Sequence, residues 1–161
     1  LAKGISTTEF APGKNITRAE FSALLIRALG ITPGTQLTGK FTDVPASEWY
    51  FNTVNTAAQA GLVSGYTATT FGPNDPVTRE QMAVMISRAL TYQGKTTTVT
   101  DANTSLQSFT DKPQISSWAL DGVAAAVEKG IIKGRSTTAF APLENATRAE
   151  AAVMILRMYN Q

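Results

Sequence analysis

Thr78-Arg79-Glu80-Gln81 has two near copies in the sequence, Thr17-Arg18-Ala19-Glu20 and Thr147-Arg148-Ala149-Glu150. Each copy follows a Phe-Ala-Pro or Phe-Gly-Pro turn, at residues 10–12, 71–73 and 140–142, and precedes an apolar run with helical spacing. Self-similarity of this kind is typical of a repeat architecture. We therefore expect one structural unit used three times.

Each copy has the pattern of a helix start. A Thr followed three residues later by Glu or Gln predicts a capping box, in which the hydroxyl accepts from the third backbone N–H and the long side chain reaches back to the cap. We therefore interpret Glu20, Gln81 and Glu150 as capping residues rather than ligands.

The arginine of the motif stands at the first helical position, as Arg18, Arg79 and Arg148. A cation there is disfavoured by a few tenths to about 1 kcal/mol, because the helix macrodipole is positive at that end. Beside free helix N–H groups, however, it could hold a carboxylate or a phosphate. The alternative is structural, either an ion pair with a nearby Asp or a stem packed on an aromatic ring.

A second arginine recurs nine residues further on, as Arg27, Arg88 and Arg157. It falls near the helix C-terminus, where a cation is favoured. At the sequence level, these three arginines require no functional explanation.

Composition excludes several classes of function. The 161 residues contain neither Cys nor His, which removes disulfides, thiol nucleophiles, histidine triads and the usual zinc sites, so we expect no metal and no cofactor. A net charge of +2 without a dense basic run argues against nucleic acid. No apolar run approaches the roughly 20 residues of a membrane span. The chain begins at Leu1 rather than Met, so we expect a fragment or a processed form.

Helical spacing dominates and strand signals are few, which predicts an all-α fold. We expect a single domain over residues 1–161, with repeat 1 at 1–31, repeat 2 at 41–93 and repeat 3 at 109–161. Polar linkers at 32–40 and 94–108 separate them, and we expect the longer one to be mobile. The first helix of repeat 2 should be capped by Ser47 and end at Gly61.

Repeat 1 is incomplete in the sequence. Residues 1–5 match the end of a first helix, at 127–131 in repeat 3, but the counterpart of residues 132–135 is missing. Either the loop is shorter in this repeat, or four residues are absent from the sequence.

These segments resemble the S-layer homology (SLH) domain. The resemblance is carried by Phe41-Thr42-Asp43-Val44-Pro45, Trp49, Gly61-Leu62-Val63-Ser64-Gly65, Phe71-x-Pro73 and Thr78-Arg79-Glu80, with their partial repetition. It implies a pseudo-threefold arrangement of three helix-loop-helix repeats, with a central helical bundle and three prongs. It also implies a secreted module at the Gram-positive cell surface, in the wall or S-layer, that anchors a surface protein by binding secondary cell wall polysaccharide of the peptidoglycan-associated wall. The expected ligand is a terminal pyruvylated N-acetylmannosamine, and an S-layer protein assembly is a further expected context.

The resemblance places the ligand in grooves between repeats. It implies as site residues the aspartate, tryptophan and glycine of repeats 2 and 3 and the motif arginine of all three repeats: Arg18, Asp43, Trp49, Gly65, Arg79, Asp111, Trp118, Gly134 and Arg148. Trp offers a flat face to a sugar, Asp accepts from hydroxyls, glycine permits close backbone approach, and Arg neutralises the pyruvate carboxylate.

Each of these residues also has a structural interpretation. The two tryptophans are in register with the apolar helix face, which favours a place in the core over ligand contact. The two aspartates could equally cap a turn before the helix.

Two other functions remain as alternatives. Paired carboxylates such as Asp43 with Glu48 could serve glycoside hydrolysis, but no acid has an obviously unique setting, so we expect no catalytic residue and no enzyme. A helical scaffold for protein partners would make the arginines structural.

The grooves should also differ from one another. Arg18 and Arg79 precede the complete Asp/Trp segments of repeats 2 and 3, whereas Arg148 would face the incomplete repeat 1. On this pairing, Arg79→Ala should weaken binding more than Arg148→Ala, with Arg18→Ala between them.

Overall fold

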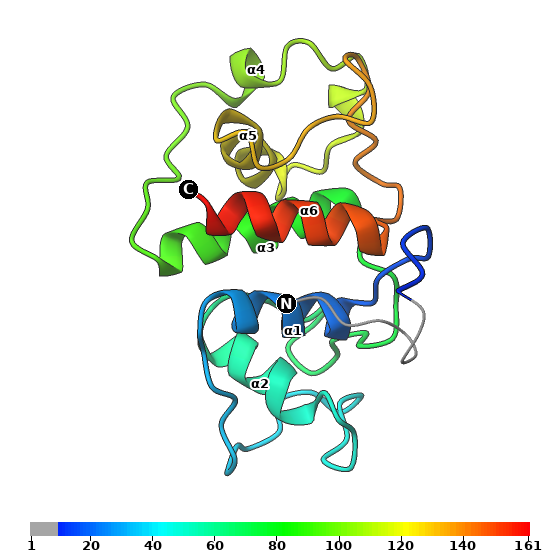
Figure 1. Ribbon diagram of the computed structural model, residues 1–161, viewed down its shortest axis with the longest axis vertical. Helices are drawn as coiled ribbons and strands as arrows, with labels where there is room; N and C mark the ends of the chain where they lie inside the picture. The colour runs from blue at the N-terminus through cyan, green and yellow to red at the C-terminus, as the bar shows by residue number, and fades with distance from the viewer. Residues whose placement is uncertain (1–9) are drawn as a thin grey trace.

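The computed structural model describes residues 10–161, which form an all-helical protein (Figure 1). The order is α1 (Arg18–Ala28), α2 (Phe51–Gln59), α3 (Arg79–Tyr92), α4 (Ala102–Ser105), the 3-10 helix η1 (Lys112–Gln114), α5 (Leu120–Glu128) and α6 (Arg148–Tyr159). Isolated β-bridges occur in this range, but no strand does. The predicted all-α class is confirmed. None of the described helices is both long and apolar enough to cross a membrane.

The three predicted helix starts are confirmed. Thr17, Thr78 and Thr147 are extended N-caps, and each has both hydrogen bonds of the capping box, with Glu20, Gln81 and Glu150 as the respective partners.

A closed ring of backbone hydrogen bonds joins the residues before these caps. The N–H of Ile16 donates to Ala146 O at 3.2 Å, that of Ala146 to Val77 O at 2.9 Å, and that of Val77 to Ile16 O at 3.0 Å. All three residues are buried, so each bond is shielded from water. The ring holds the starts of α1, α3 and α6 together.

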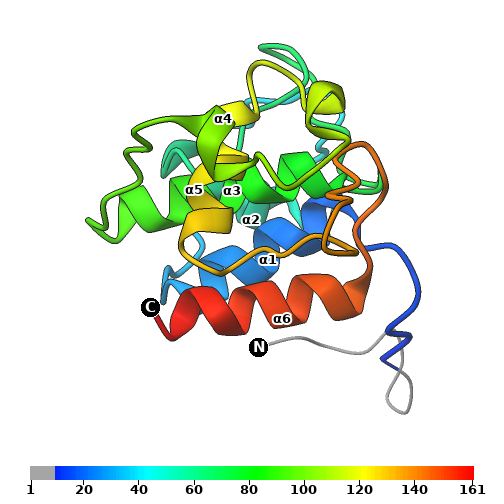
Figure 2. The same ribbon diagram turned by 90° about the horizontal axis from the view of Figure 1, so that it is seen from above.

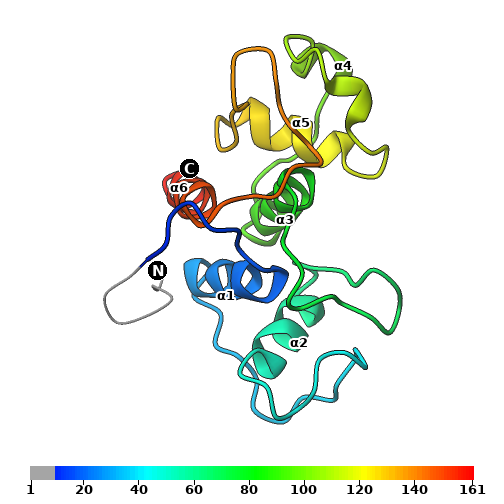
Figure 3. The ribbon, with the colours of Figure 1, turned by 90° about the vertical axis from the view of Figure 1, so that its right-hand side faces the viewer.

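These three helices lie together at the centre of the molecule when it is viewed as in Figure 3. Their inward faces supply much of the core, including Phe21, Met82, Ile86, Ile155 and Met158. The other long helices pack outside them: α2 on α1, and α5 on α3. Figures 1 and 3 show α2 and α5 at opposite ends of the molecule.

The outer face of α6 has no covering helix in residues 10–161. Val153, Leu156 and Tyr159 are exposed there, and Figure 2 shows α6 along one edge of the molecule. The expected match of residues 1–5 to a first helix lies outside the described residues. The backbone hydrogen bonds among Ile16, Val77 and Ala146 form a closed ring, but a threefold arrangement of whole repeats stays a prediction. The repeat boundaries also stay a prediction.

Two local expectations were wrong. Ser47 does not cap a helix: α2 begins only at Phe51, after Tyr50, which makes no side-chain cap hydrogen bond. The longer linker is not simply a loop, because it contains α4, which Asp101 caps and which packs toward α5. Leu106, directly after α4, is fully buried, and this apolar anchor fixes the linker to the fold.

Candidate ligand grooves between the repeats

Within residues 10–161, three grooves run beside the central helices. The first, which we call the Trp118 groove, has a volume of about 350 Å³. Its lining combines one arginine of α1, the loop after α2, one face of α3 and the segment before α5: Arg18, Val63, Ser64, Gly65, Tyr66, Gln81, Val84, Met85, Arg88 and Trp118. Residues from all three repeats therefore meet in one groove of a size typical of small-ligand sites.

The other two grooves use equivalent positions. The Trp49 groove, of about 270 Å³, is lined by Ile16, Glu20, Ala23, Leu24, Arg27, Trp49 and Arg148. The Arg135 groove, of about 380 Å³, is lined by Arg79, Lys133, Gly134, Arg135, Ala149, Glu150, Val153, Met154 and Arg157. Each groove thus takes a motif arginine from one repeat and a helix face from the next.

The expected pairing of arginines with tryptophans was wrong. Arg18 shares a groove with Trp118, and Arg148 shares one with Trp49. No tryptophan lines the groove of Arg79. The expectation paired each arginine with the tryptophan of the next repeat along the chain. In the structure, the tryptophan in the groove comes instead from the repeat after the next one, counted cyclically: repeat 3 for Arg18 and repeat 2 for Arg148.

The core interpretation of the tryptophans was also wrong. Trp49 is 59% exposed and Trp118 is 60% exposed. Both precede their helices, α2 and α5, rather than lying within them, so the helical register that favoured the core does not apply. Each presents a large exposed aromatic surface and lines its groove.

The motif arginines are almost completely buried. The Nε of Arg18 donates to Phe71 O at 2.9 Å, that of Arg79 to Phe140 O at 2.9 Å, and that of Arg148 to Phe10 O at 3.0 Å. In each case the guanidinium also lies over the ring of the same phenylalanine, at 4.6, 5.1 and 5.2 Å from the centroid respectively. In all three repeats the guanidinium, rather than the stem named in the structural alternative, makes the contact with the aromatic ring.

The helix N–H groups beside these arginines are not free. The N–H of Arg18 donates to Asp75 O at 2.9 Å, that of Arg79 to Glu144 O at 2.9 Å, and that of Arg148 to Lys14 O at 2.8 Å. The expectation of an anion site made jointly by the cation and free backbone donors is therefore wrong, because turns of neighbouring repeats already satisfy these donors. At these three helix starts, binding of an anion would therefore fall to side chains.

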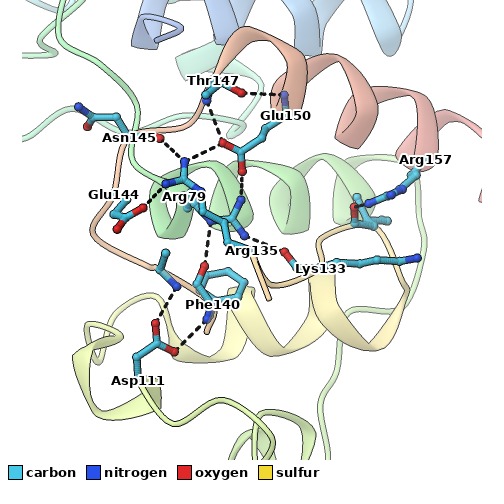
Figure 4. Close-up of polar contacts among 12 residues, drawn as sticks. Arg79, Asp111, Lys133, Arg135, Phe140, Glu144, Asn145, Thr147, Glu150 and Arg157 are labelled. Atoms are coloured by element: carbon cyan, nitrogen blue, oxygen red, sulfur yellow. Dashed lines mark hydrogen bonds and ion pairs between the residues drawn. The ribbon is translucent and has the colours of Figure 1, made fainter. Parts of the chain in front are cut away.

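Two of the three arginines are ion-paired across repeats. Arg79 contacts Glu150, as Figure 4 shows, and Arg148 contacts Glu20. The same two glutamates complete the capping boxes, each with its other carboxylate oxygen. Arg135 also contacts Glu150 and Glu144, so the Arg135 groove holds an ion-pair network.

Arg18 is arranged differently. Its Nη2 donates to Ser64 O at 2.9 Å, and its guanidinium lies 4.5 Å from the Tyr66 ring centroid, but no carboxylate in residues 10–161 forms an ion pair with it. The position equivalent to Glu20 and Glu150 is occupied by neutral Gln81.

Burial and nearby charges act on the pKa of the Arg18 guanidinium. Burial is the largest effect and lowers the pKa, while Tyr66, Asp75 and Asp43 act in the opposite direction. Burial also raises the pKa of the Tyr66 hydroxyl. The Arg18 guanidinium therefore lies in a largely desolvated setting beside the Tyr66 ring.

The two aspartates hold the Phe-containing turns. The carboxylate of Asp43 accepts from Phe71 N–H and from Gly72 N–H, both at 2.8 Å. Asp111 accepts from Phe140 N–H at 2.9 Å and from Ala141 N–H at 2.7 Å (Figure 4). They anchor the turns that carry the carbonyl acceptors of Arg18 and Arg79, and a contact of either aspartate with a sugar stays a prediction.

Gly65 and Gly134 stand where a side chain has no room. A Cβ on Gly65 would lie 2.3 Å from Thr70 O and 2.6 Å from a ring carbon of Phe41, and one on Gly134 would lie 2.4 Å from Ser136 O. Tight loop packing alone thus requires glycine. Each glycine also lines a groove, which leaves backbone accessible to a ligand there.

Sequence reasoning missed part of the lining. Arg27, Arg88 and Arg157, set aside as ordinary C-terminal cations, line the Trp49, Trp118 and Arg135 grooves in that order. The Nη1 of Arg88 donates to the Ser64 hydroxyl at 2.9 Å, which places this cation beside the loop. Their nine-residue spacing from the motif arginine was the available signal, because it recurs in all three repeats.

The sequence profile of the S-layer homology domain matches residues 1–22, 40–83 and 108–152. Relatives include an amylopullulanase of Thermoanaerobacterium thermosulfurigenes, 39% identical over 96% of this chain, and an exoglucanase of Acetivibrio thermocellus, also 39% identical over 96%. A cellulosome-anchoring protein of A. thermocellus is 30% identical over 96% of this chain.

The chain spans 8%, 14% and 34% of the lengths of these three relatives. The similarity to the enzymes therefore covers a small part of each and marks a shared, non-catalytic anchoring module rather than a shared activity. Other relatives are surface-layer proteins, so the family is that of cell-surface and wall-anchored proteins of Gram-positive bacteria. With its profile matched in three segments and its capped helices joined in a ring, this chain belongs to the S-layer homology domain family.

Proposed function

We propose that this module anchors its host protein to the cell wall by binding secondary cell wall polysaccharide, with a terminal pyruvylated N-acetylmannosamine in the Trp118 groove. The observation that carries the proposal is the lining of that groove. It combines an exposed tryptophan, a tyrosine and two arginines, and it includes no carboxylate.

The chemistry of the groove fits an acidic sugar. The exposed face of Trp118 suits the apolar face of a pyranose ring. Arg18 and Arg88 suit the carboxylate of a pyruvate ketal, because hydrogen bonds to charged acceptors are the strong ones. The Ser64 hydroxyl and the backbone at Gly65 offer polar contacts for sugar hydroxyls or the acetamide.

The same lining disfavours glycoside hydrolysis. That reaction ordinarily uses two carboxyl groups about 5 to 10 Å apart, one on each side of the scissile bond. The Trp118 groove has no acidic side chain in its lining. We therefore assign this groove to binding, with anchoring of an S-layer or other surface protein as the consequence.

Calorimetric titration with purified wall polymer, with and without its pyruvate ketal, tests the proposal. Removal of the ketal should weaken binding by about tenfold or more, since a charge-assisted hydrogen bond contributes about 1.5–3 kcal/mol. Trp118→Ala and Arg88→Ala should each weaken binding. Tyr92→Ala, which removes an exposed aromatic ring outside the grooves, is the matched control and should not. Equal affinity for the two polymers would refute the carboxylate assignment.

A further inference from the structure

The third residue of each central helix differs in one repeat only. It is Glu20 in α1 and Glu150 in α6, but Gln81 in α3. All three side chains make the same capping hydrogen bond, with the N–H of the preceding Thr donating at 3.1 Å. The capping box therefore forms with either glutamate or glutamine. The two residue types differ at the other terminal atom of the side chain, which does not take part in the cap.

In Glu20 and Glu150, that other atom contacts the motif arginine of the neighbouring repeat, and Gln81 lines the same groove as Arg18. In the two glutamates it is a carboxylate oxygen, Oε2, which accepts from Nη1 of Arg148 and of Arg79 respectively. In Gln81 it is an amide nitrogen, which is a donor and cannot accept from Arg18. The sequence change thus removes the acceptor that the other two grooves provide.

Arg18 keeps one guanidinium nitrogen for the groove. Its Nε and Nη2 donate to the carbonyls of Phe71 and Ser64, while Nη1 has no hydrogen-bond partner within residues 10–161. No buried side-chain nitrogen or oxygen in that range lacks a partner, so Nη1 is reached by solvent, and Arg18 lines the Trp118 groove.

Neighbouring acids do not substitute for the missing glutamate. Both oxygens of Asp43 accept backbone N–H groups, and Asp75 makes no ion pair with Arg18. In the Arg135 groove, by contrast, Glu150 neutralises Arg79 and also contacts Arg135. The lining of the Arg135 groove also contains the cations Lys133 and Arg157, but it contains no tryptophan.

We propose that Gln81 is the residue that selects the Trp118 groove for an acidic ligand, because it leaves Nη1 of Arg18 open to a ligand carboxylate. In the Trp49 and Arg135 grooves, Glu20 and Glu150 already occupy the equivalent guanidinium position. This inference rests on the proposed function and deepens it. It predicts one dominant carboxylate site per module rather than three equal sites.

The substitution Gln81→Glu tests it. Glutamate makes the same capping box in the other two repeats, so the variant should fold and melt at or above the parent temperature. The control is Gln107→Glu, which adds the same charge at an exposed position outside the grooves. The probes are the methyl glycosides of N-acetylmannosamine with and without the pyruvate ketal, titrated into the parent and both variants.

Gln81→Glu should weaken binding of the ketal-bearing glycoside by about tenfold or more, because the new carboxylate pairs with Arg18 and competes with the ligand. Binding of the neutral glycoside should change by less than about twofold, and Gln107→Glu should match the parent with both. If Gln81→Glu binds the ketal-bearing glycoside as the parent does, the role of Gln81 is refuted and the proposed function stands. If the parent itself does not prefer the ketal-bearing glycoside, both fall.

Discussion

Removal of the contact between Glu80 and Ser116 tests directly how the fold positions Trp118. Glu80, at the second position of α3, is 3% exposed, and its carboxylate accepts from the N–H of Ser116 at 2.9 Å and from its hydroxyl at 2.7 Å. Ser116 lies two residues before Trp118, in the segment that leads into α5. The equivalent residues in the other repeats are Ala19 and Ala149, so Glu80→Ala is compatible with a helix at this position.

The expected energies follow from the two bonds. Hydrogen bonds to a charged acceptor contribute about 1.5–3 kcal/mol when buried, but Ser116 is only half-buried, and water replaces part of each bond once it is broken. We expect Ser116→Ala to cost about 1 kcal/mol of unfolding free energy and Glu80→Ala about 2–3 kcal/mol. The double variant should show a coupling of about 1 kcal/mol, because the hydroxyl bond can be lost only once.

Urea unfolding of the four proteins in this cycle gives the coupling energy. A second readout, acrylamide quenching of Trp118 fluorescence in a Trp49→Phe background, should show a more accessible indole in Glu80→Ala. Affinity for the polymer should fall about threefold or more, since the indole is no longer held in place. A coupling below about 0.3 kcal/mol, together with unchanged quenching, would refute the positioning role of Glu80.

Three further predictions concern the core, the loop and the acid response. Met85→Ala and Met154→Ala should each destabilise the protein by about 2–5 kcal/mol, since both side chains are buried in the hydrophobic core, and unchanged thermal melts would contradict this packing. Gly65→Ala should cost about 1–3 kcal/mol, because the added Cβ meets backbone carbonyl oxygens, and a melt equal to that of the parent would show that the loop can yield. Burial opposes ionisation of Glu150, but hydrogen bonds from Arg135 and Thr147 and the charges of Arg79 and Arg135 outweigh it, so its pKa lies below the ordinary value of 4.5. Because the pKa of Glu150 is lowered in the folded state, its ionised form stabilises the protein at pH values above 4.5, and this stabilisation is lost as the pH falls through the folded-state pKa. The variant Glu150→Gln should therefore show a smaller decline in urea midpoint below pH 4.5 than the parent. Parallel declines of the two proteins would exclude this linkage.

The sequence alone determined the helical class and the places where the central helices begin. Capping boxes are local, because Thr78 and Gln81 meet within one helical turn, and no distant contact is needed to form them. The repeat itself was equally visible, because it requires only comparison of the chain with itself.

Local reasoning failed where the contact partner is distant in the chain. Ser47 has the chemistry of a cap, yet α2 begins four residues later, and Trp49 and Trp118 fit an apolar helical register although both lie outside the helices and are exposed. The aspartates show the same limit. Asp43 could be recognised as a turn residue, but not as the one that holds the turn at Phe71.

Only the tertiary structure decided which residues share a groove. The ring of bonds through Ile16, Val77 and Ala146 sets the order of the repeats in space, and that order brings Trp118 from repeat 3 to Arg18 of repeat 1. The same packing places Gln81 in the Trp118 groove, where the equivalent Glu20 and Glu150 of the other two grooves form ion pairs with arginine. The grooves therefore differ in charge. Neither is encoded in a short segment of sequence, because ion pairing and groove lining depend on side chains that only the packing of the three repeats brings within a few ångströms.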